Sequence, residues 1–349
     1  MSRISRNDAP PSLFRTPPGP RPLPAALIRA FGVAVAALLA PSLALAQSSG
    51  TYPVRPIRLV VPFAPGGPAD IIARSISPRM GELLGQTLIL ENRGGAGGSI
   101  GSEVVARAAP DGYTLCLASQ SSFVFAPWLY NKFPYDSVKD FTPISTVVIT
   151  PFVIAINPRV PAKSVADLLR LGKGKQGFLT FGSSGPGSTS HIGGELLQAA
   201  TGLSLLHVPY KGTGPSIAAV VAGEIDMMVA DLGPVIQHAK DGRLRMLAAV
   251  GSRRTAAAPD LPTLNETGLR MQALDGRFGI MGPAGLSKDI VTRLHSVIVQ
   301  TIKTPDVRQR FETLGYDPVG DTPEQYAQSV RTELEIFGKI IRNAGIKPE

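Results

Sequence analysis

Cysteine is nearly absent from this chain of 349 residues, which has only Cys116. A single cysteine excludes an intrachain disulfide. Cys116 lies inside the apolar run 113–118, and thiols in the interior of a strand are buried and inert. We therefore expect a structural residue rather than a nucleophile. Export of a protein of this size does not require disulfides, so the low count does not exclude an extracytoplasmic location.

Motifs for metal binding and catalysis are also missing. The four histidines show no metal-ligand spacing, either with one another or with the cysteine. The turn Gly182-Ser-Ser-Gly-Pro186 fails the GxSxG pattern of a hydrolase nucleophile because its last position is proline. We expect neither a metal nor a cofactor, and we interpret the chain as a non-enzyme. A pair of His191 with Ser183 or Ser184 leaves a hydrolase or lyase as a second hypothesis.

Clusters of lysine and arginine interleaved with aromatic residues are absent, so nucleic acid is not an expected partner. The net charge is +9, and residues 1–46 contribute +4 of it, from five arginines against Asp8. The remaining +5 makes the rest of the chain mildly basic. This balance suits an anionic ligand, but it also suits an ordinary basic surface, and the sequence leaves both readings open.

The N-terminus carries an apolar run at residues 31–40, with Arg29 before it and Ala44-Leu-Ala46 after it. A basic residue, a short apolar run and a small-x-small site form the layout of a secretory signal peptide. The run is shorter than the about 20 residues that a transmembrane helix needs. We expect residues 1–46 to be a signal peptide cleaved near Ala46, and the mature chain to be periplasmic. An N-terminal membrane anchor is the alternative.

From residue 47 onward, short β-branched runs alternate with glycine- or serine-rich turns and helical patterns. The strand 57–62, the turn 65–68 and the helix 69–84 form the first such unit. This alternation predicts parallel α/β sheets.

The alternation of strands and helices breaks near 147–156 and near 275–283. We interpret these two segments as crossings between two separate lobes of the protein. The predicted lobe 1 is discontinuous and comprises residues 47–149 and 277–349. The predicted lobe 2 comprises residues 150–276.

Three glycine-rich turns, at 65–68, 94–99 and 182–188, each lie between a strand and a helix. In open α/β sheets, ligands bind at the carboxyl ends of strands. A helix N-terminus offers unpaired N–H groups and a partial positive charge, which attract anions. None of the turns matches a nucleotide-binding motif. Together they predict a cleft that binds carboxylate or phosphate, although glycines can also serve tight turns alone.

Five motifs in order along the chain make a recognisable set. They are Val61-Pro-Phe-Ala-Pro-Gly-Gly-Pro-Ala-Asp70, Glu91-Asn-Arg-Gly-Gly-Ala-Gly-Gly-Ser-Ile-Gly101, Phe181-Gly-Ser-Ser-Gly-Pro-Gly-Ser188, His207-Val-Pro-Tyr-Lys-Gly212 and Thr322-Pro-Glu-Gln-Tyr326. As a set they resemble the Bug (Bordetella uptake gene) family, the periplasmic solute receptors of tripartite tricarboxylate transporters. The resemblance covers essentially the whole chain after the signal segment.

The resemblance implies a type II periplasmic-binding-protein fold, in which two α/β lobes are joined by two crossover strands with a ligand cleft between them. It implies a monomer that captures a small carboxylate or related solute by closure of the cleft. It also implies delivery to the membrane permease subunits of the transporter. A sensory role, in which the ligand is presented to a membrane sensor kinase, uses the same cleft and stays open.

The resemblance also implies a set of ligand-binding residues. Asp70 is expected to orient the first turn rather than touch an anion. Asp231 could meet an amino group of the ligand or only cap the next helix. The expected site comprises Phe63, Ala64, Pro65, Gly66, Gly67 and Asp70 in the first turn, Ser119, Ser121 and Ser122 after the third strand, Ser183, Ser184, Gly187, Ser188 and Thr189 in lobe 2, and Asp231.

Two positions depart from the family pattern. The chain has Ser121-Ser-Phe-Val124 where the family often has Ser-Thr-His-Ala, and Arg277 where a tryptophan often precedes Phe-Gly. An arginine near the cleft favours a more anionic ligand, whereas on the crossover surface it is only an exposed charge. Both departures put the usual substrate of the family in doubt.

Overall fold

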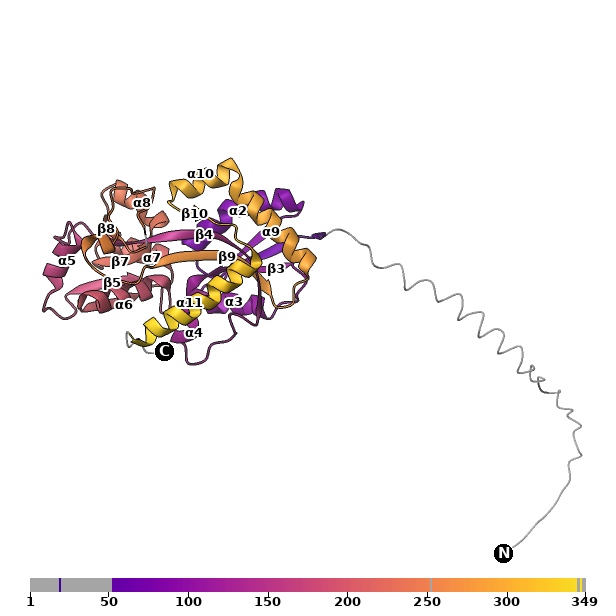
Figure 1. Ribbon diagram of the computed structural model, residues 1–349, viewed down its shortest axis with the longest axis horizontal. Coiled ribbons are helices and arrows are strands. Elements are labelled where there is room, and N and C mark those ends of the chain that lie inside the picture. Colours follow the sequence, from indigo (N-terminus) through magenta and orange to yellow (C-terminus); the bar gives the residue numbers. More distant parts are fainter. Residues whose placement is uncertain (1–18, 20–51, 252, 344–345, 347–349) are drawn as a thin grey trace, which may run out of the picture. The chain divides into compact units, whose positions relative to one another are not determined.

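The protein is described from a computed structural model. The structure describes residues 19, 52–251, 253–343 and 346. The predicted signal peptide lies outside the described residues apart from Gly19. From residue 52 onward the described chain alternates strands and helices, as the sequence predicts (Figure 1).

Among the described residues, ten strands form the sheet. They are β1 (Ile57–Val61), β2 (Leu88–Asn92), β3 (Thr114–Ser119), β4 (Phe141–Ile156), β5 (Leu179–Ser183), β6 (Leu205–Pro209), β7 (Met227–Asp231), β8 (Arg245–Ala249), β9 (Asp275–Pro283) and β10 (Asp317–Pro318). The helices are α2 (Pro68–Leu84), α3 (Ser99–Ala106), α4 (Ala126–Leu129), α5 (Val165–Gly172), α6 (Thr189–Thr201), α7 (Thr213–Ala222), α8 (Leu232–Lys240), α9 (Lys288–Lys303), α10 (Pro305–Thr313) and α11 (Pro323–Asn343). Three further short helical segments are η1 (Ala96–Gly98), η2 (Ser121–Phe125) and η3 (Asn265–Thr267).

The strand order is β2-β1-β3-β9-β4-β7-β5-β6, with β8 and β10 paired to β4. The same pattern occurs at both ends of the sheet. β1 is parallel to β2 and β3, and β9 follows as an antiparallel neighbour of β3. Likewise β5 is parallel to β6 and β7, and β4 is the antiparallel neighbour of β7. We call the part built on β1, β2 and β3 lobe 1 and the part built on β5, β6 and β7 lobe 2.

The long strands β4 and β9 connect the two lobes and lie side by side (Figure 1). The apolar runs on either side of Pro151 each suggest a separate strand, but β4 is continuous through that residue. Pro151 is the last residue of β4 to pair with β9, and Phe152 is the first to pair with β7. Proline cannot donate a ladder hydrogen bond. Because Pro151 stands where one neighbouring strand gives way to another, its missing N–H is tolerated.

Alternate residues of the lobe 1 strands enter cores on opposite faces of the sheet, because strand side chains alternate in direction. Leu59 and Leu117 belong to the core that includes α2 and α9. Val60 and Cys116 belong to the core that includes α3 and α11. Cys116 is fully buried, and this burial raises the pKa of its thiol to about 12. The expected structural role of this cysteine is confirmed.

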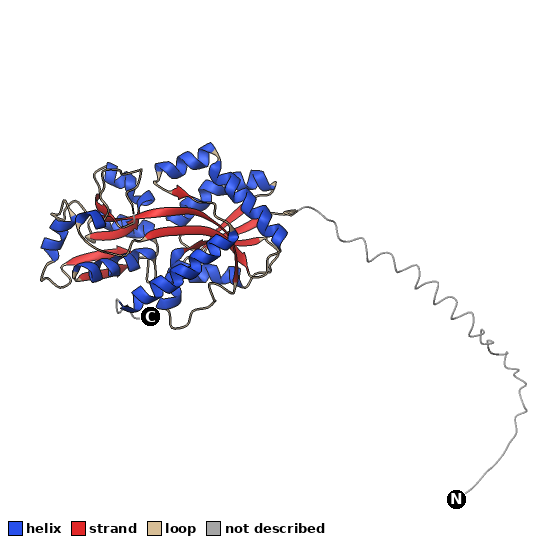
Figure 2. Ribbon diagram, in the orientation of Figure 1, coloured by secondary structure: helices blue, strands red, loops and turns tan. Residues whose placement is uncertain are grey.

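Lobe 2 has the same two-sided construction, with helices on both faces of the strands (Figure 2). Val153 packs with α7 and α8 on one face, whereas Ile154 packs with α5 and α6 on the other. The second of these cores also takes in Phe125 and, from α11, Phe337. Both phenylalanines fall in the predicted lobe 1, so parts of that segment pack against lobe 2. The residue boundaries of the lobes therefore stay a prediction.

Several helix boundaries follow from local chemistry. Ser164 caps α5 by accepting a hydrogen bond from the backbone N–H of Asp167. Pro305 and Pro323 open α10 and α11, where the missing N–H of a proline is not needed. Within the described residues, no helix combines the length and apolar character that a membrane crossing requires.

Candidate ligand-binding site

The first glycine-rich turn is held in shape by Asp70. Its carboxylate accepts hydrogen bonds from Gly66 N at 3.0 Å, from Arg74 Nε at 2.9 Å and from Asn92 Nδ2 at 3.1 Å. Burial alone raises the pKa of Asp70, but these hydrogen bonds outweigh it and hold the pKa below the ordinary value. An ionised carboxylate with three donors is already satisfied. Asp70 therefore orients the turn, which is the role that the sequence favoured.

The N-termini of α2 and α7 face each other across the gap between the lobes. Each begins after a glycine, Gly67 and Gly212 respectively, and neither is capped by a side chain. A Cβ atom added to Gly67 would lie 3.7 Å from Thr213 Oγ1, and one added to Gly212 would lie 3.4 Å from Ala64 Cβ. A helix N-terminus carries about half a positive charge. Two uncapped N-termini at close range thus make a site suited to an anion.

A small cavity of about 40 Å³ lies at this junction. Its walls come from both lobes and from the two crossover strands. Six predicted residues line it, namely Phe63, Ala64, Gly67, Ser119, Ser121 and Thr189. Six lining residues were not predicted, namely Pro68, Ala69, Phe152, Gly212, Thr213 and Phe278.

The turn at Gly212 and Thr213 could have been found from its position alone. It follows β6 and precedes α7, so it lies at the carboxyl end of a strand like the three turns that the sequence singled out. It has only Gly212 and Gly214, separated by Thr213, and so lacks the adjacent glycines of the turns at 65–68 and 94–99. Phe152 and Phe278 carried no such signal, because a phenylalanine in a strand is usually a core residue.

The other predicted residues lie around the cavity without lining it. Ser122 is fully buried, and its hydroxyl lies 3.0 Å from that of Ser119. Ser184 lines an adjoining groove of about 580 Å³, together with Lys211 and the glycine-rich segment 94–98. The predicted residues outside the cavity wall are Pro65, Gly66, Asp70, Ser122, Ser183, Ser184, Gly187, Ser188 and Asp231.

The polar groups of the turn 183–188 bond mainly to one another and to the start of α6. Ser188 caps α6 by accepting from His191 N, and its own hydroxyl donates to Gly185 O at 2.6 Å. The backbone N–H of Ser184 donates to Ser190 Oγ at 2.9 Å. These groups build the turn, so they offer fewer donors to a ligand than the sequence suggested.

Two histidines stack behind this turn. The rings of His191 and His207 lie 4.2 Å apart and nearly parallel, and His207 also stacks on Phe181. Nδ1 of His191 accepts a hydrogen bond from Gly187 N at 3.2 Å. Burial lowers the pKa of His191 to about 4, and the neighbouring His207 makes a smaller contribution in the same direction. Burial also lowers the pKa of His207. Both rings are therefore neutral at pH 7.

The serine–histidine pair considered for a hydrolase does not form as expected. His207, not His191, contacts a serine hydroxyl, with Nε2 2.7 Å from Ser183 Oγ. Ser183 is fully buried, and its Oγ also accepts from Gly185 N. Among the described residues, no hydrogen bond joins Ser184 to His191. The Ser183–His207 contact thus supports the turn and does not present a nucleophile to the cavity.

Asp231 and Arg277 both have partners within the protein. Asp231 is buried, caps α8 through Gly233 N, and accepts from the hydroxyl of Tyr316 at 2.7 Å. Arg277 forms an ion pair with Glu333 at 2.9 Å. Neither residue lines the cavity. Of the two roles left open for Asp231, the structure shows the capping role.

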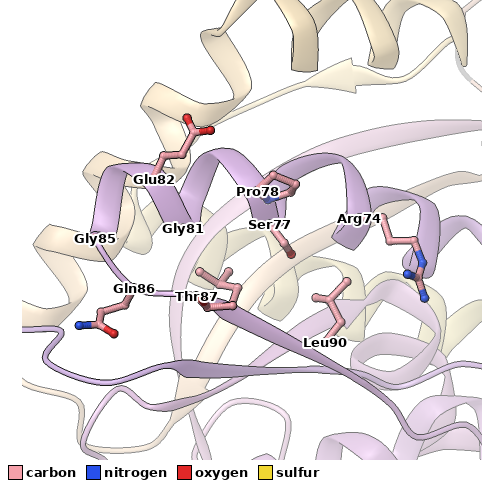
Figure 3. A pocket seen from close by; sticks show the side chains of 10 residues that line it. Arg74, Ser77, Pro78, Gly81, Glu82, Gly85, Gln86, Thr87 and Leu90 are labelled. Atoms are coloured by element: carbon pink, nitrogen blue, oxygen red, sulfur yellow. The ribbon is translucent and has the colours of Figure 1, made fainter.

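A second hollow lies on lobe 1, between α2 and the edge strand β2. Figure 3 shows Ser77 and Pro78 of α2 above Thr87 and Leu90. None of the predicted site residues lines this hollow, and no residue of lobe 2 lines it either. Within the described residues, no group of three or more His, Cys, Asp or Glu side chains is placed to hold a metal ion.

Comparison with known families identifies the family of this chain. The model of the tripartite tricarboxylate transporter family receptor matches residues 72–346. The chain belongs to this receptor family. A curated relative, protein BugT of Bordetella pertussis, is 33% identical over 316 residues, which are 90% of this chain and 95% of that protein.

Solved structures of similar receptors have the same fold. The periplasmic binding protein BugD has a TM-score of 0.82 at 33% identity, covering 85% of this chain and 100% of that one. The R. palustris protein Rpa4515, solved with adipate, has a TM-score of 0.83 at 30% identity, again covering 85% of this chain and 100% of that one. The predicted periplasmic-binding-protein fold of two α/β lobes is confirmed. The receptor family is one of solute-binding proteins rather than enzymes.

Proposed function

We propose that this receptor captures a small carboxylate in the periplasm and delivers it to the membrane subunits of a tripartite tricarboxylate-type transporter. The observation that carries the proposal is the pair of uncapped helix N-termini, α2 and α7, that meet at the inter-lobe cavity. An anion at a helix N-terminus needs no charged side chain as a partner. The adipate held by the relative Rpa4515 is an anion of this class.

Capture would proceed by closure of the two lobes about β4 and β9. Hydrogen bonds already join the predicted lobe 1 to the predicted lobe 2, and two of them reach the turn before α6. The hydroxyl of Ser121 lies 3.0 Å from Gly187 O, and that of Tyr130 lies 3.0 Å from Pro186 O. A ligand that contacts both lobes favours the closed form by its differential affinity for that form. The cavity of about 40 Å³ must widen to admit a solute, so an open form is part of the proposal.

The proposal includes the predicted lobes, residues 47–149 with 277–349 and residues 150–276. It also includes export, with cleavage near Ala46. A periplasmic fraction prepared from cells that express the full chain should contain a protein whose N-terminal residue is Gln47. Recovery of uncleaved protein in the membrane fraction would support an N-terminal anchor instead.

The carboxylate site can be tested by calorimetric titration of purified residues 47–349 after unfolding and refolding, which removes carried-over solute. Each carboxylate is compared with its amide, for example hexanoate with hexanamide and adipate with adipamide. The carboxylates should bind at least tenfold more tightly, because only they carry the charge that the helix N-termini favour. Equal binding of acids and amides would contradict the proposal.

Thr213→Asp provides a specific variant. It places a negative charge at the N-terminus of α7, facing the cavity, where it repels a ligand carboxylate. An acidic residue at this position also favours the helix dipole, so the fold should keep its stability. We expect affinity to fall at least thirtyfold. Thr213→Asn, which has similar size and no charge, is the matched control and should retain most of the affinity.

A further inference from the structure

The cavity wall contains no titratable side chain. Its twelve residues, all within the described part of the chain, are phenylalanines, alanines, glycines, a proline and hydroxyl residues. The two carboxylates and the guanidinium group described above already have partners within the protein. Asp70 is bonded to Arg74, Asp231 to Tyr316, and Arg277 to Glu333. Lys211 lines the adjoining groove and not the cavity, so the cavity wall itself holds no ion of either sign for a second charge on the ligand.

The donors in the wall are unevenly distributed. The uncapped start of α7 supplies backbone N–H groups, α2 supplies them only beyond Pro68, which has none, and Thr213 adds a hydroxyl. Beside the expected lobe 2 residues, the start of α6 is capped by Ser188. Ser121 also contacts protein acceptors, with its hydroxyl 2.9 Å from Gly97 O. One pole of the cavity therefore suits an anion better than any other part of its wall.

The remaining wall is strongly apolar. Phe63 comes from the first turn, Phe152 from β4 and Phe278 from β9. Phe152 and Phe278 are only 5% and 7% exposed, so both side chains are buried. A charge placed among such groups loses its hydration without gaining a partner, and this cost is large.

We propose that the receptor selects a carboxylate with one negative charge and an apolar, uncharged body. The carboxylate lies at the starts of α2 and α7, and the body packs among the three phenylalanines. An ammonium group or a second carboxylate at the far end is selected against. The inference rests on the proposed function and narrows its substrate class, and it separates this chain from the relative solved with the dicarboxylate adipate.

The test uses sets of three ligands that differ only at the far end. The first set is hexanoate, adipate and 6-aminohexanoate. Butanoate, succinate and 4-aminobutanoate shorten the body. Benzoate, terephthalate and 4-(aminomethyl)benzoate make it aromatic. Each is titrated into refolded residues 47–349 at pH 7.5. Within the set that binds most tightly, we expect the monocarboxylate to bind at least tenfold more tightly than either doubly functional analogue.

A variant with an added cation should reverse the preference for the monocarboxylate over the dicarboxylate. Thr189→Arg introduces a cation into the cavity wall at the start of α6, where it can pair with a second carboxylate. It should improve the affinity for the dicarboxylate relative to the monocarboxylate by at least tenfold. Thr189→Gln has a long polar side chain without charge and should not. Thermal unfolding of both variants checks that each is folded before the affinities are compared.

The possible outcomes separate the two proposals. Tighter binding of a monocarboxylate, with reversal in Thr189→Arg, supports the inference. Tighter binding of a dicarboxylate or an amino acid by the unmodified protein overturns it and leaves the carboxylate-receptor function standing. Binding of no carboxylate in any set overturns both.

Discussion

The hydroxyl of Ser121 lies 3.0 Å from the carbonyl oxygen of Gly187, and the two residues fall in the predicted lobe 1 and the predicted lobe 2, respectively. Ser121 begins η2, directly after the third strand of lobe 1, whereas Gly187 lies in the turn before α6. This contact joins the lobes beside the cavity that both residues were predicted to form. Under the proposed closure of the lobes, this contact links the geometry of the lobe 2 turn to the approach of the two lobes.

Ser121→Ala should weaken ligand binding about three- to tenfold, since a hydrogen bond of this kind contributes about 0.5–1.5 kcal/mol. On the predicted lobe boundaries the bond can form only when the lobes meet, so its loss should disfavour the proposed closed form. Calorimetric titration measures the change. Ser75→Ala removes a serine hydroxyl that donates to Ile71 O within α2, away from the cavity, and should leave affinity unchanged. Equal effects of the two variants would exclude a role of Ser121 in closure.

Gly187→Ala tests the turn itself. Gly187 has φ of +73°, and an added Cβ would lie 3.3 Å from the ring of Tyr130. A residue with a side chain pays about 1 kcal/mol or more for this left-handed conformation. We expect weaker binding with the fold retained, measured by titration and thermal unfolding. Gly174→Ala, at φ of +73° with open space around it, is the control for the backbone cost alone. An unchanged affinity in Gly187→Ala would show that the turn does not contribute to the site.

The stacked histidines predict a loss of stability in acid. The pKa of His191 is about 4 in the folded protein, below its value of about 6.5 when unfolded, so the unfolded chain binds the extra proton first. The contribution of His191 is fully present above pH 6.5 and is lost as the pH falls toward 4. The loss is roughly 3 kcal/mol at most. Urea denaturation from pH 7.5 to pH 4.5 measures it.

His191→Asn is the matched variant for this measurement. An asparagine side chain can accept the hydrogen bond from Gly187 N but does not titrate in this range. Stability should then depend less steeply on pH between 6.5 and 4. The same slope in the variant and the unmodified protein would assign the acid sensitivity to other groups.

The contribution of Asp231 to stability depends on pH in the opposite direction. Burial raises its pKa to about 6, although hydrogen bonds from groups such as Tyr316 oppose the shift. The folded protein thus holds the proton more tightly than the unfolded chain, and the stability that protonation contributes is lost as pH rises from about 4 to 6. Asp231→Asn keeps a good helix cap and an acceptor for Tyr316. It should stabilise the protein at pH 8 by about 1 kcal/mol.

Thermal unfolding at pH 8 and pH 5 checks this expectation. The gain from Asp231→Asn should be larger at pH 8, where the unmodified carboxyl is ionised. Tyr316→Phe removes the hydroxyl that bonds Asp231 and should destabilise the protein at pH 8, because the buried carboxylate then loses a donor. A destabilised Asp231→Asn at pH 8 would show that the charge itself is required.

The sequence determined the parts of this protein that depend on local order along the chain. β-branched runs, glycine turns and helical periodicity specify the alternating elements, because strand and helix periods are properties of neighbouring residues. Asp70 could be assigned to the first turn because an aspartate that caps or orients a turn acts within a few residues. The family motifs, which also lie in short segments, likewise identified the receptor fold.

Only the tertiary structure decided which groups reach the cavity. Phe152 and Phe278 look like core residues in the sequence, yet the crossing of β4 and β9 between the lobes places them in the cavity wall. The serines of the turn 183–188 look like ligand donors, yet the backbone conformation pairs them largely with one another and with α6. Periodicity fixes the kind of element that a segment forms. The approach of segments far apart in the chain fixes which polar groups remain available to a ligand and which are already bonded.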